Sequence, residues 1–185
     1  MLQQYQHILV AIDGSYEAEL AFKKAVAVAK RNQAELILIH IVDTRAFQNV
    51  SSFDSAMVEQ VTENAKTTME GYVDQAKKAG LEKVSFSIEY GAPKTIIARD
   101  IPKAKNIDLI MIGATGLNAV ERLLIGSVTE YVTRNALCDV LVVRTDLSNK
   151  PALASTKKPT PHEPNDLLNQ RLHHINGLIK NELLL

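Results

Sequence analysis

The sequence predicts an open, doubly wound sheet of parallel strands with helices on both faces, and three observations lead to this α/β class. Short apolar runs alternate along the chain with longer amphipathic stretches. Four of the five runs are nearly continuous in Ile, Leu and Val, which is typical of parallel strands covered on both faces. Every connection is long enough for a helical crossover, and such crossovers join parallel strands.

The apolar runs are expected to form strands at 7–12, 35–42, 84–90, 108–113 and 139–144. The run VSFSIEY differs from the others because apolar and polar residues alternate along it. Alternation with a period of two indicates a strand with one exposed face. We therefore expect 84–90 at an edge of the sheet.

The stretches between the strands predict helices at 16–32, 55–80, 93–104 and 127–135. The first has an apolar stripe at helical spacing, and Glu17 adds a favourable charge near its N-terminus. Gly80 is a typical residue just beyond the end of a helix. Pro93 is tolerated in the first turn of the third helix.

The composition changes after residue 145, so we divide the chain into a domain at 1–145, a linker at 146–164 and a C-terminal segment at 165–185. The linker holds four of the six prolines, among Ser, Thr and Lys, and is expected to be flexible and partly extended. The C-terminal segment predicts an amphipathic helix whose apolar stripe consists of Leu168, Leu172, Ile175, Ile179 and Leu183.

Charge and composition argue against several classes of protein. Basic and acidic residues number 21 each, so the net charge is zero, and broad binding to a nucleic-acid backbone is not expected. Cys138 is the single cysteine, which excludes an internal disulfide. The sequence shows neither a signal peptide nor 18 consecutive apolar residues, so we expect a cytoplasmic protein without a membrane partner.

Polar residues that follow the strands are the candidates for a binding site, because doubly wound sheets bind ligands at the carboxyl ends of their strands. Asp13 follows the first strand and has two interpretations. It can cap the turn at Gly14 and Ser15, or it can contact ribose hydroxyls or a phosphate-bound Mg²⁺. His40 lies within an apolar strand, where a core role is favoured over a catalytic one.

The stretch IGATGLNAVERLLIGSVTE, at 112–130, is the most specific candidate. Gly113 and Gly116 follow a strand, and glycine permits positive φ and lets an anion approach the backbone. The next helix starts at Gly126, where free amides and the helix dipole favour phosphate. The amides and hydroxyls offered there belong to Gly126, Ser127, Val128 and Thr129. The alternative is a long loop with two tight turns and no ligand.

These glycines resemble the motif G-2x-G-9x-G-(S/T) of the nucleotide-binding branch of the universal stress protein family. Gly113, Gly116, Gly126 and Ser127 match it without a gap. Further matches are ILVAIDGS, HIVD, YGAP, LLIGSVTE and VLVVR, so the resemblance covers about residues 5–145.

The resemblance implies a strand order of 3-2-1-4-5, ATP with Mg²⁺ bound between strands one and four, and a homodimer paired through 139–144. It implies that Asp13 contacts the ribose or the metal region, and that Ala11 and Ile41 line the adenine slot. Gly113 and Gly116 are implied to flank the phosphate loop, with Ile112 nearby. The implied phosphate cradle consists of Gly126, Ser127, Val128 and Thr129.

The expected function is an ATP-binding module in stress response and signalling, with little or no turnover. The sequence shows no P-loop lysine, activated nucleophile or paired bases, so no catalytic residue is assigned. The alternatives are a slow ATP-hydrolysing enzyme and a partner-binding protein that needs no nucleotide. The segment 165–185 lies outside the resemblance, and we expect it to bind a protein partner or the dimer itself.

Overall fold

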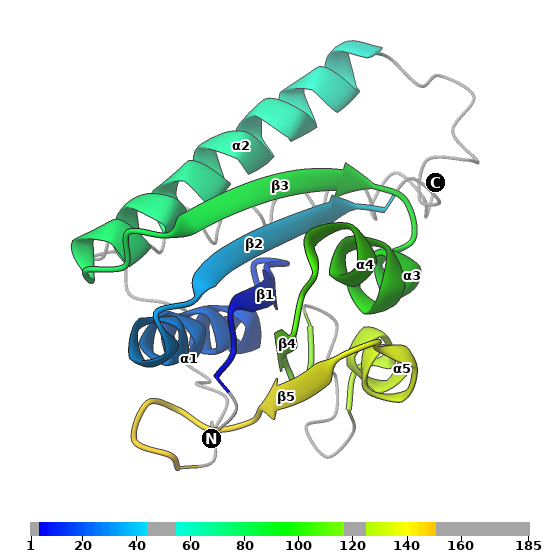
Figure 1. Cartoon of the computed structure of the whole chain (residues 1–185). Helices are drawn as coiled ribbons and strands as arrows, with labels where there is room; N and C mark the ends of the chain where they lie inside the picture. Colours follow the sequence, from blue (N-terminus) through cyan, green and yellow to red (C-terminus); the bar gives the residue numbers. More distant parts are fainter. Residues whose placement is uncertain (1–3, 44–54, 117–124, 151–185) are drawn as a thin grey trace.

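The expected strands form one sheet, in which all neighbours are parallel and the order is β3-β2-β1-β4-β5 (Figure 1). The computed structural model describes residues 4–43, 55–116 and 125–150. Its strands are β1 His7–Ala11, β2 Glu35–Val42, β3 Val84–Tyr90, β4 Leu109–Gly113 and β5 Asp139–Val143. The predicted fold class and strand order are therefore confirmed.

The helices also follow the prediction closely. They are α1 Tyr16–Asn32, α2 Ser55–Lys78, α3 Pro93–Thr95, α4 Ile101–Lys105 and α5 Ser127–Asn135. α1 and α5 have the predicted bounds, and α2 ends two residues before the predicted end at 80. In the described part of the chain, no helix is both long and apolar enough to cross a membrane.

A π-helical turn, η2 Ile96–Asp100, separates α3 from α4 within the single helix expected at 93–104. The amide of Ile101 donates to the carbonyl of Ile96, five residues earlier, as in a π-helix. Pro102 has no amide hydrogen for the carbonyl of Ala98, so the α-helical pattern is interrupted here. The sequence prediction missed this turn.

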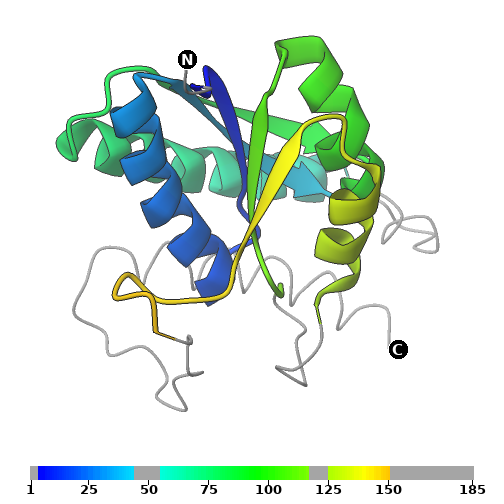
Figure 2. The same cartoon turned by 60° about the horizontal axis from the view of Figure 1, so that its bottom comes forward.

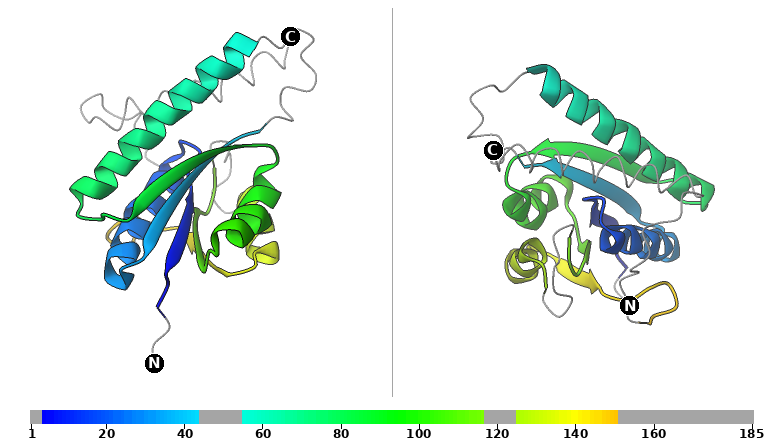
Figure 3. Two further views of the ribbon diagram at one scale, coloured as in Figure 1. Left: turned by 45° about the horizontal axis from the view of Figure 1, so that its top comes forward. Right: turned by 180° about the vertical axis from the view of Figure 1, so that it is seen from behind.

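Side chains alternate between the faces of the sheet and build two cores. On one face, β1 contributes Ile8 and Val10 to a core shared with α1 and α2. On the other face, Leu9 packs with residues of η2, α4 and α5. Two views show α1 and α2 on one side of the sheet and the remaining helices on the other (Figures 2 and 3). On both faces, the helices begin near the carboxyl ends of the strands that precede them.

The sequence predicted the exposure of one edge strand, β3, correctly and that of the other, β5, incorrectly. β3 is an edge strand, as predicted from its alternation. β5 was expected to be covered on both faces, and this expectation is wrong, because Asp139 and Leu141 are exposed. The physical reason is the position of α1, which packs mainly on β4 and β1 and only partly reaches β5.

The chain after β5 turns back beside α1. Asp146 accepts hydrogen bonds from the amides of Ser148 and Lys150 and so closes the turn. Lys24 of α1 donates to Thr145 Oγ1 at 2.7 Å and to Asn149 Oδ1 at 3.3 Å. The rest of the linker expected at 146–164 and the helix expected at 165–185 lie outside the described residues.

Candidate functional site

The candidate site lies at the carboxyl ends of β1 and β4, where the strand order reverses. From β1 the chain continues through α1 to β2, whereas from β4 it continues through α5 to β5. The two connections run on opposite faces of the sheet, as the two cores show. Such a switch point is the usual binding crevice of a doubly wound sheet.

Asp13 links the end of β1 to the loop after β4. Its Oδ1 accepts a hydrogen bond from the amide of Ser15 at 2.9 Å, so the turn-capping interpretation is confirmed. Its Oδ2 would lie only 2.6 Å from a Cβ atom added to Gly116. The structure thus brings together two predicted site residues that are far apart in the sequence.

Ser15 and Gly14 complete the start of α1, and the sequence analysis did not assign either of them to the site. Ser15 Oγ accepts the amide hydrogen of Ala18 at 3.1 Å and caps the helix. Gly14 has a φ of 83°, a value that residues with side chains rarely adopt. The Asp-Gly-Ser sequence after an apolar strand, which predicted the turn, is also the signal that could have added Gly14 and Ser15 to the site.

Gly113 and Gly116 are required for close packing, and neither uses the positive φ that glycine permits. The described glycines with positive φ are Gly14, Gly80 and Gly91. A Cβ atom on Gly113 would lie 2.8 Å from the carbonyl carbon of Glu17, in the first turn of α1. Gly126 has a φ of −62°, and its amide donates to the carbonyl of Ala114 at 2.8 Å. This bond joins the start of the loop to its end, and it uses the Gly126 amide, so the expectation of a free amide is wrong at this residue.

The start of α5 faces this loop. Gly126 is the N-cap and supplies no capping side chain, and the first amides of a helix have no partner within the helix itself. Ser127 is exposed and Val128 is half-buried. Thr129 is buried, and its hydroxyl donates to the carbonyl of Gly113 at 2.8 Å. The hydroxyl of Thr129 therefore fixes the end of β4. The group that Thr129 still offers at the helix start is its backbone amide.

The apolar residues expected at the adenine slot, Ala11 and Ile41, share one face of the sheet with Ile112, which was expected near the phosphate loop. Ala11 and Ile41 are half-buried and Ile112 is buried, and all three belong to the core beside α4 and α5. They come from three adjacent strands, β1, β2 and β4. This edge therefore combines an apolar wall with the carboxylate of Asp13 and the helix start of α5.

His40 is buried in β2, as expected of a core residue, with 3% of its surface exposed. Its Nδ1 lies 2.8 Å from the carbonyl oxygen of Ile12, the residue before Asp13. Burial lowers the pKa of the ring, so the neutral form is favoured at pH 7. A carbonyl only accepts hydrogen bonds, so Nδ1 carries the proton and donates it.

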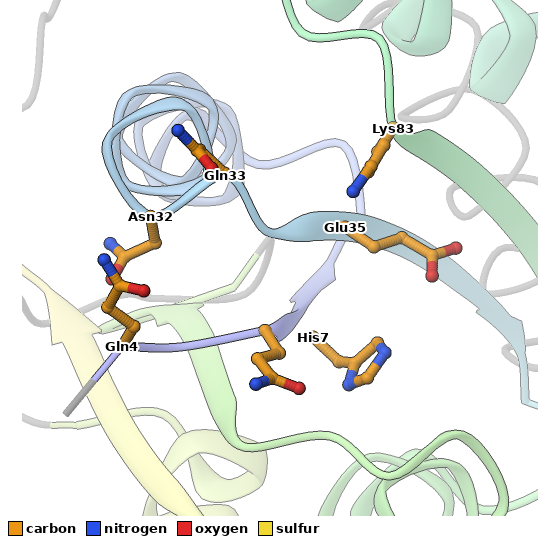
Figure 4. A pocket seen from close by; sticks show the side chains of 7 residues that line it. Gln4, His7, Asn32, Gln33, Glu35 and Lys83 are labelled. Atoms are coloured by element: carbon orange, nitrogen blue, oxygen red, sulfur yellow. The ribbon is translucent and has the colours of Figure 1, made fainter.

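A polar depression of about 490 Å³ lies at the opposite, amino edge of the sheet (Figure 4). Its lining residues are Gln4, Gln6, His7, Asn32, Gln33, Glu35 and Lys83. Three backbone donors at this edge are already used: Asp108 accepts from the amides of Gln6 and His7, and the amide of Glu35 donates to the Gln6 carbonyl. We therefore assign the candidate site to the carboxyl edge. Among the described residues, no cluster of His, Cys, Asp and Glu could hold a metal ion by itself.

The fold and this edge are those of a doubly wound α/β protein with a candidate binding site at its switch point. The model of the universal stress protein family matches residues 4–144. A curated relative from Staphylococcus haemolyticus, described as a universal stress protein, is 46% identical over 142 residues, which cover 77% of this chain and 86% of the relative. The chain therefore belongs to the universal stress protein family.

Solved structures of the family agree with this assignment. The universal stress protein UspA from Lactobacillus plantarum is 33% identical, with a TM-score of 0.64, over 77% of this chain and 99% of that one. A universal stress protein solved in complex with cAMP is 26% identical, with a TM-score of 0.57, over 76% of this chain and 98% of that one.

The close packing at Gly113 predicts an asymmetric effect of alanine substitutions. Gly113→Ala should lower the free energy of unfolding by about 2–3 kcal/mol, because the new Cβ meets backbone atoms. Gly126→Ala is the matched control, since its Cβ would have no neighbour nearer than 3.4 Å, and it should cost at most about 1 kcal/mol as a poorer N-cap. Urea unfolding followed by circular dichroism measures both, and equal losses would contradict this account.

The lowered pKa of His40 predicts a loss of stability in acid. The unfolded chain binds a proton at this histidine below about pH 6.5, whereas the folded protein resists protonation. The free energy of unfolding should therefore fall below pH 6.5, by at most about 1.4 kcal/mol per pH unit from this group. His40→Asn should show a shallower fall between pH 7 and pH 5 in the same unfolding measurement. Parallel curves would show that His40 does not contribute.

Proposed function

We propose that this protein is an ATP-binding module of stress response and signalling that binds the nucleotide between β1 and β4 with little or no turnover. The observation that carries the proposal is the meeting of Asp13 with Gly116 beside the start of α5. Gly116, which has no side chain, lets the Asp13 carboxylate lie against the loop, and the helix start offers donors and a positive dipole to the phosphates of a ligand. The relative solved with cAMP supports a nucleotide as the ligand class.

The proposed roles follow the geometry of the edge. The amides of Ser127, Val128 and Thr129 at the start of α5 bind the phosphates, with the hydroxyl of Ser127 as a further donor. Gly126, whose amide donates to the Ala114 carbonyl, joins the loop to the helix start. Ile112, Gly113 and Gly116 form the loop that the phosphates approach. Ala11 and Ile41 contact the adenine, since both are half-buried beside the second core.

Asp13 is the acidic group of the proposed site, and its carboxylate accepts hydrogen bonds from ribose hydroxyls. A Mg²⁺ ion held by the phosphates and Asp13 would supply the charge that offsets their repulsion. The motif has no P-loop lysine, and phosphoryl transfer depends on such cationic groups. Binding with little hydrolysis is therefore the function that the site favours.

Calorimetry on the full chain, stripped of bound nucleotide and with Mg²⁺ present, tests the proposal. We expect wild type to bind ATP with a micromolar dissociation constant. Ser127→Ala should weaken binding by roughly tenfold, since it removes a hydrogen bond to a charged group. Ser148→Ala, at an exposed serine in the turn after β5, is the matched control and should leave affinity unchanged. No binding by wild type would refute the nucleotide function, and rapid phosphate release would favour the enzyme alternative.

We also propose that a second copy pairs along β5. A free strand edge is a template for pairing with another chain, and the exposed apolar side chains at β5 would be buried in such a dimer. Leu137, just before the strand, is 64% exposed, and Leu141 within it is 43% exposed.

Leu141→Glu should shift the protein from dimer to monomer in analytical ultracentrifugation, because the dimer would bury an unpaired charge. Tyr90→Lys on β3, the opposite edge, is the control at a similarly exposed residue, 46% against 43%, and should leave the mass unchanged. A wild-type protein that sediments as a monomer would refute the dimer.

The C-terminal segment 165–185 and the cellular setting complete the proposal. We propose a cytoplasmic protein whose C-terminal segment binds a protein partner through its apolar stripe of Leu and Ile residues. The support is the composition of the segment and its position after a proline-rich linker.

A further inference from the structure

His40 contacts the peptide group that leads into the candidate site. Ile12 follows the last residue of β1, and its side chain and backbone are buried, with 2% exposure. Its amide donates to the carbonyl of Ile39 at 2.8 Å, and its carbonyl accepts from the ring of His40, also at 2.8 Å. Both polar groups of Ile12 are thus held by β2.

The carbonyl of Ile12 needs this partner because a buried carbonyl without a hydrogen bond is costly. The paired register of β1 with β4 ends at Val10, before Ile12 is reached. A side chain from β2 therefore supplies the donor that a continued strand would otherwise supply. In β2, which is otherwise apolar from Leu36 to Val42, histidine is the residue with such a donor.

We propose that His40 is a positioning residue of the nucleotide site, which sets the orientation of Asp13 through the Ile12 carbonyl. The inference rests on the proposed nucleotide function. The carbonyl of Ile12 and the amide of Asp13 belong to one planar peptide group, so a hydrogen bond that fixes the carbonyl also fixes the plane from which Asp13 starts.

The effect reaches the site through Asp13 itself. From this plane, Oδ1 binds the amide of Ser15, while Oδ2 lies against Gly116. Ser15 then caps α1 through Ala18. Rotation of the Ile12–Asp13 peptide would move the carboxylate away from Gly116 and weaken its bond to Ser15.

Four variants separate positioning from simple filling of the core. His40→Asn keeps an N–H donor near the place of Nδ1, whereas His40→Gln moves the donor one bond further out. His40→Leu fills the space and leaves the Ile12 carbonyl without a donor. Met111→Ala is the control for general destabilisation, because Met111 is buried in the other core, beside α1.

Two measurements on the full chain follow the effect. Amide hydrogen exchange at Ser15, read by NMR without nucleotide, reports on its bond to Asp13. Calorimetry with ATP and Mg²⁺ reports on the site. We expect His40→Leu and His40→Gln to raise exchange at Ser15 and to weaken ATP binding by roughly tenfold each. His40→Asn should stay within about twofold of wild type in both measurements, and Met111→Ala should leave ATP affinity unchanged.

The outcomes distinguish this inference from the proposed function. If His40→Gln and His40→Leu keep wild-type exchange and affinity, His40 serves only the core and the inference is wrong. Equal losses in Met111→Ala would also overturn it. If His40→Leu fails to fold, the contrast between His40→Asn and His40→Gln decides. If wild type does not bind ATP, the proposed function fails, while exchange at Ser15 still tests the effect of His40 on Asp13.

Discussion

The close approach of α1 to the end of β4 is the constraint on which the candidate site depends. Because Gly113 has no side chain, the first turn of α1 can pack directly against it at Glu17. The same turn begins with the Ser15 cap, which Asp13 supports. A larger residue at Gly113 would move α1 outward and separate Asp13 from Gly116. The packing of α1 on β4 therefore also determines the positions of the site residues Asp13 and Gly116.

Local patterns in the sequence were sufficient for most of the fold. The bounds of α1 were predicted correctly from its apolar stripe at helical spacing, and those of α5 from Gly126 at its start. The π-turn was missed because Pro93 and Pro102 lie nine residues apart, and each alone is compatible with a helix start. The exposure of β5 was missed because it depends on how far α1 reaches across the sheet.

For the site, the sequence likewise predicted the positions of the residues but not the contacts between them. Their positions after β1 and β4 follow from the strand pattern, and the family resemblance agrees with them. The reason for the glycines could not be predicted, since the contact between Gly113 and Glu17 joins residues far apart in the chain. The bond from His40 to Ile12 spans 28 positions and depends on the parallel register of β1 and β2. Such contacts follow from tertiary packing and leave no periodic signal.

Helix α1 makes contacts with three separate regions of the molecule along its length. Its first turn belongs to the candidate site, Lys24 holds the turn after β5, and Lys30 donates to the carbonyl of Ala79 just beyond α2. A helix of 17 residues is about 25 Å long and moves as one body. A tilt of α1 at the candidate site would therefore be transmitted through Lys24 to Thr145 and Asn149. Through these contacts α1 couples the candidate site to the turn after β5 and to the chain just beyond α2.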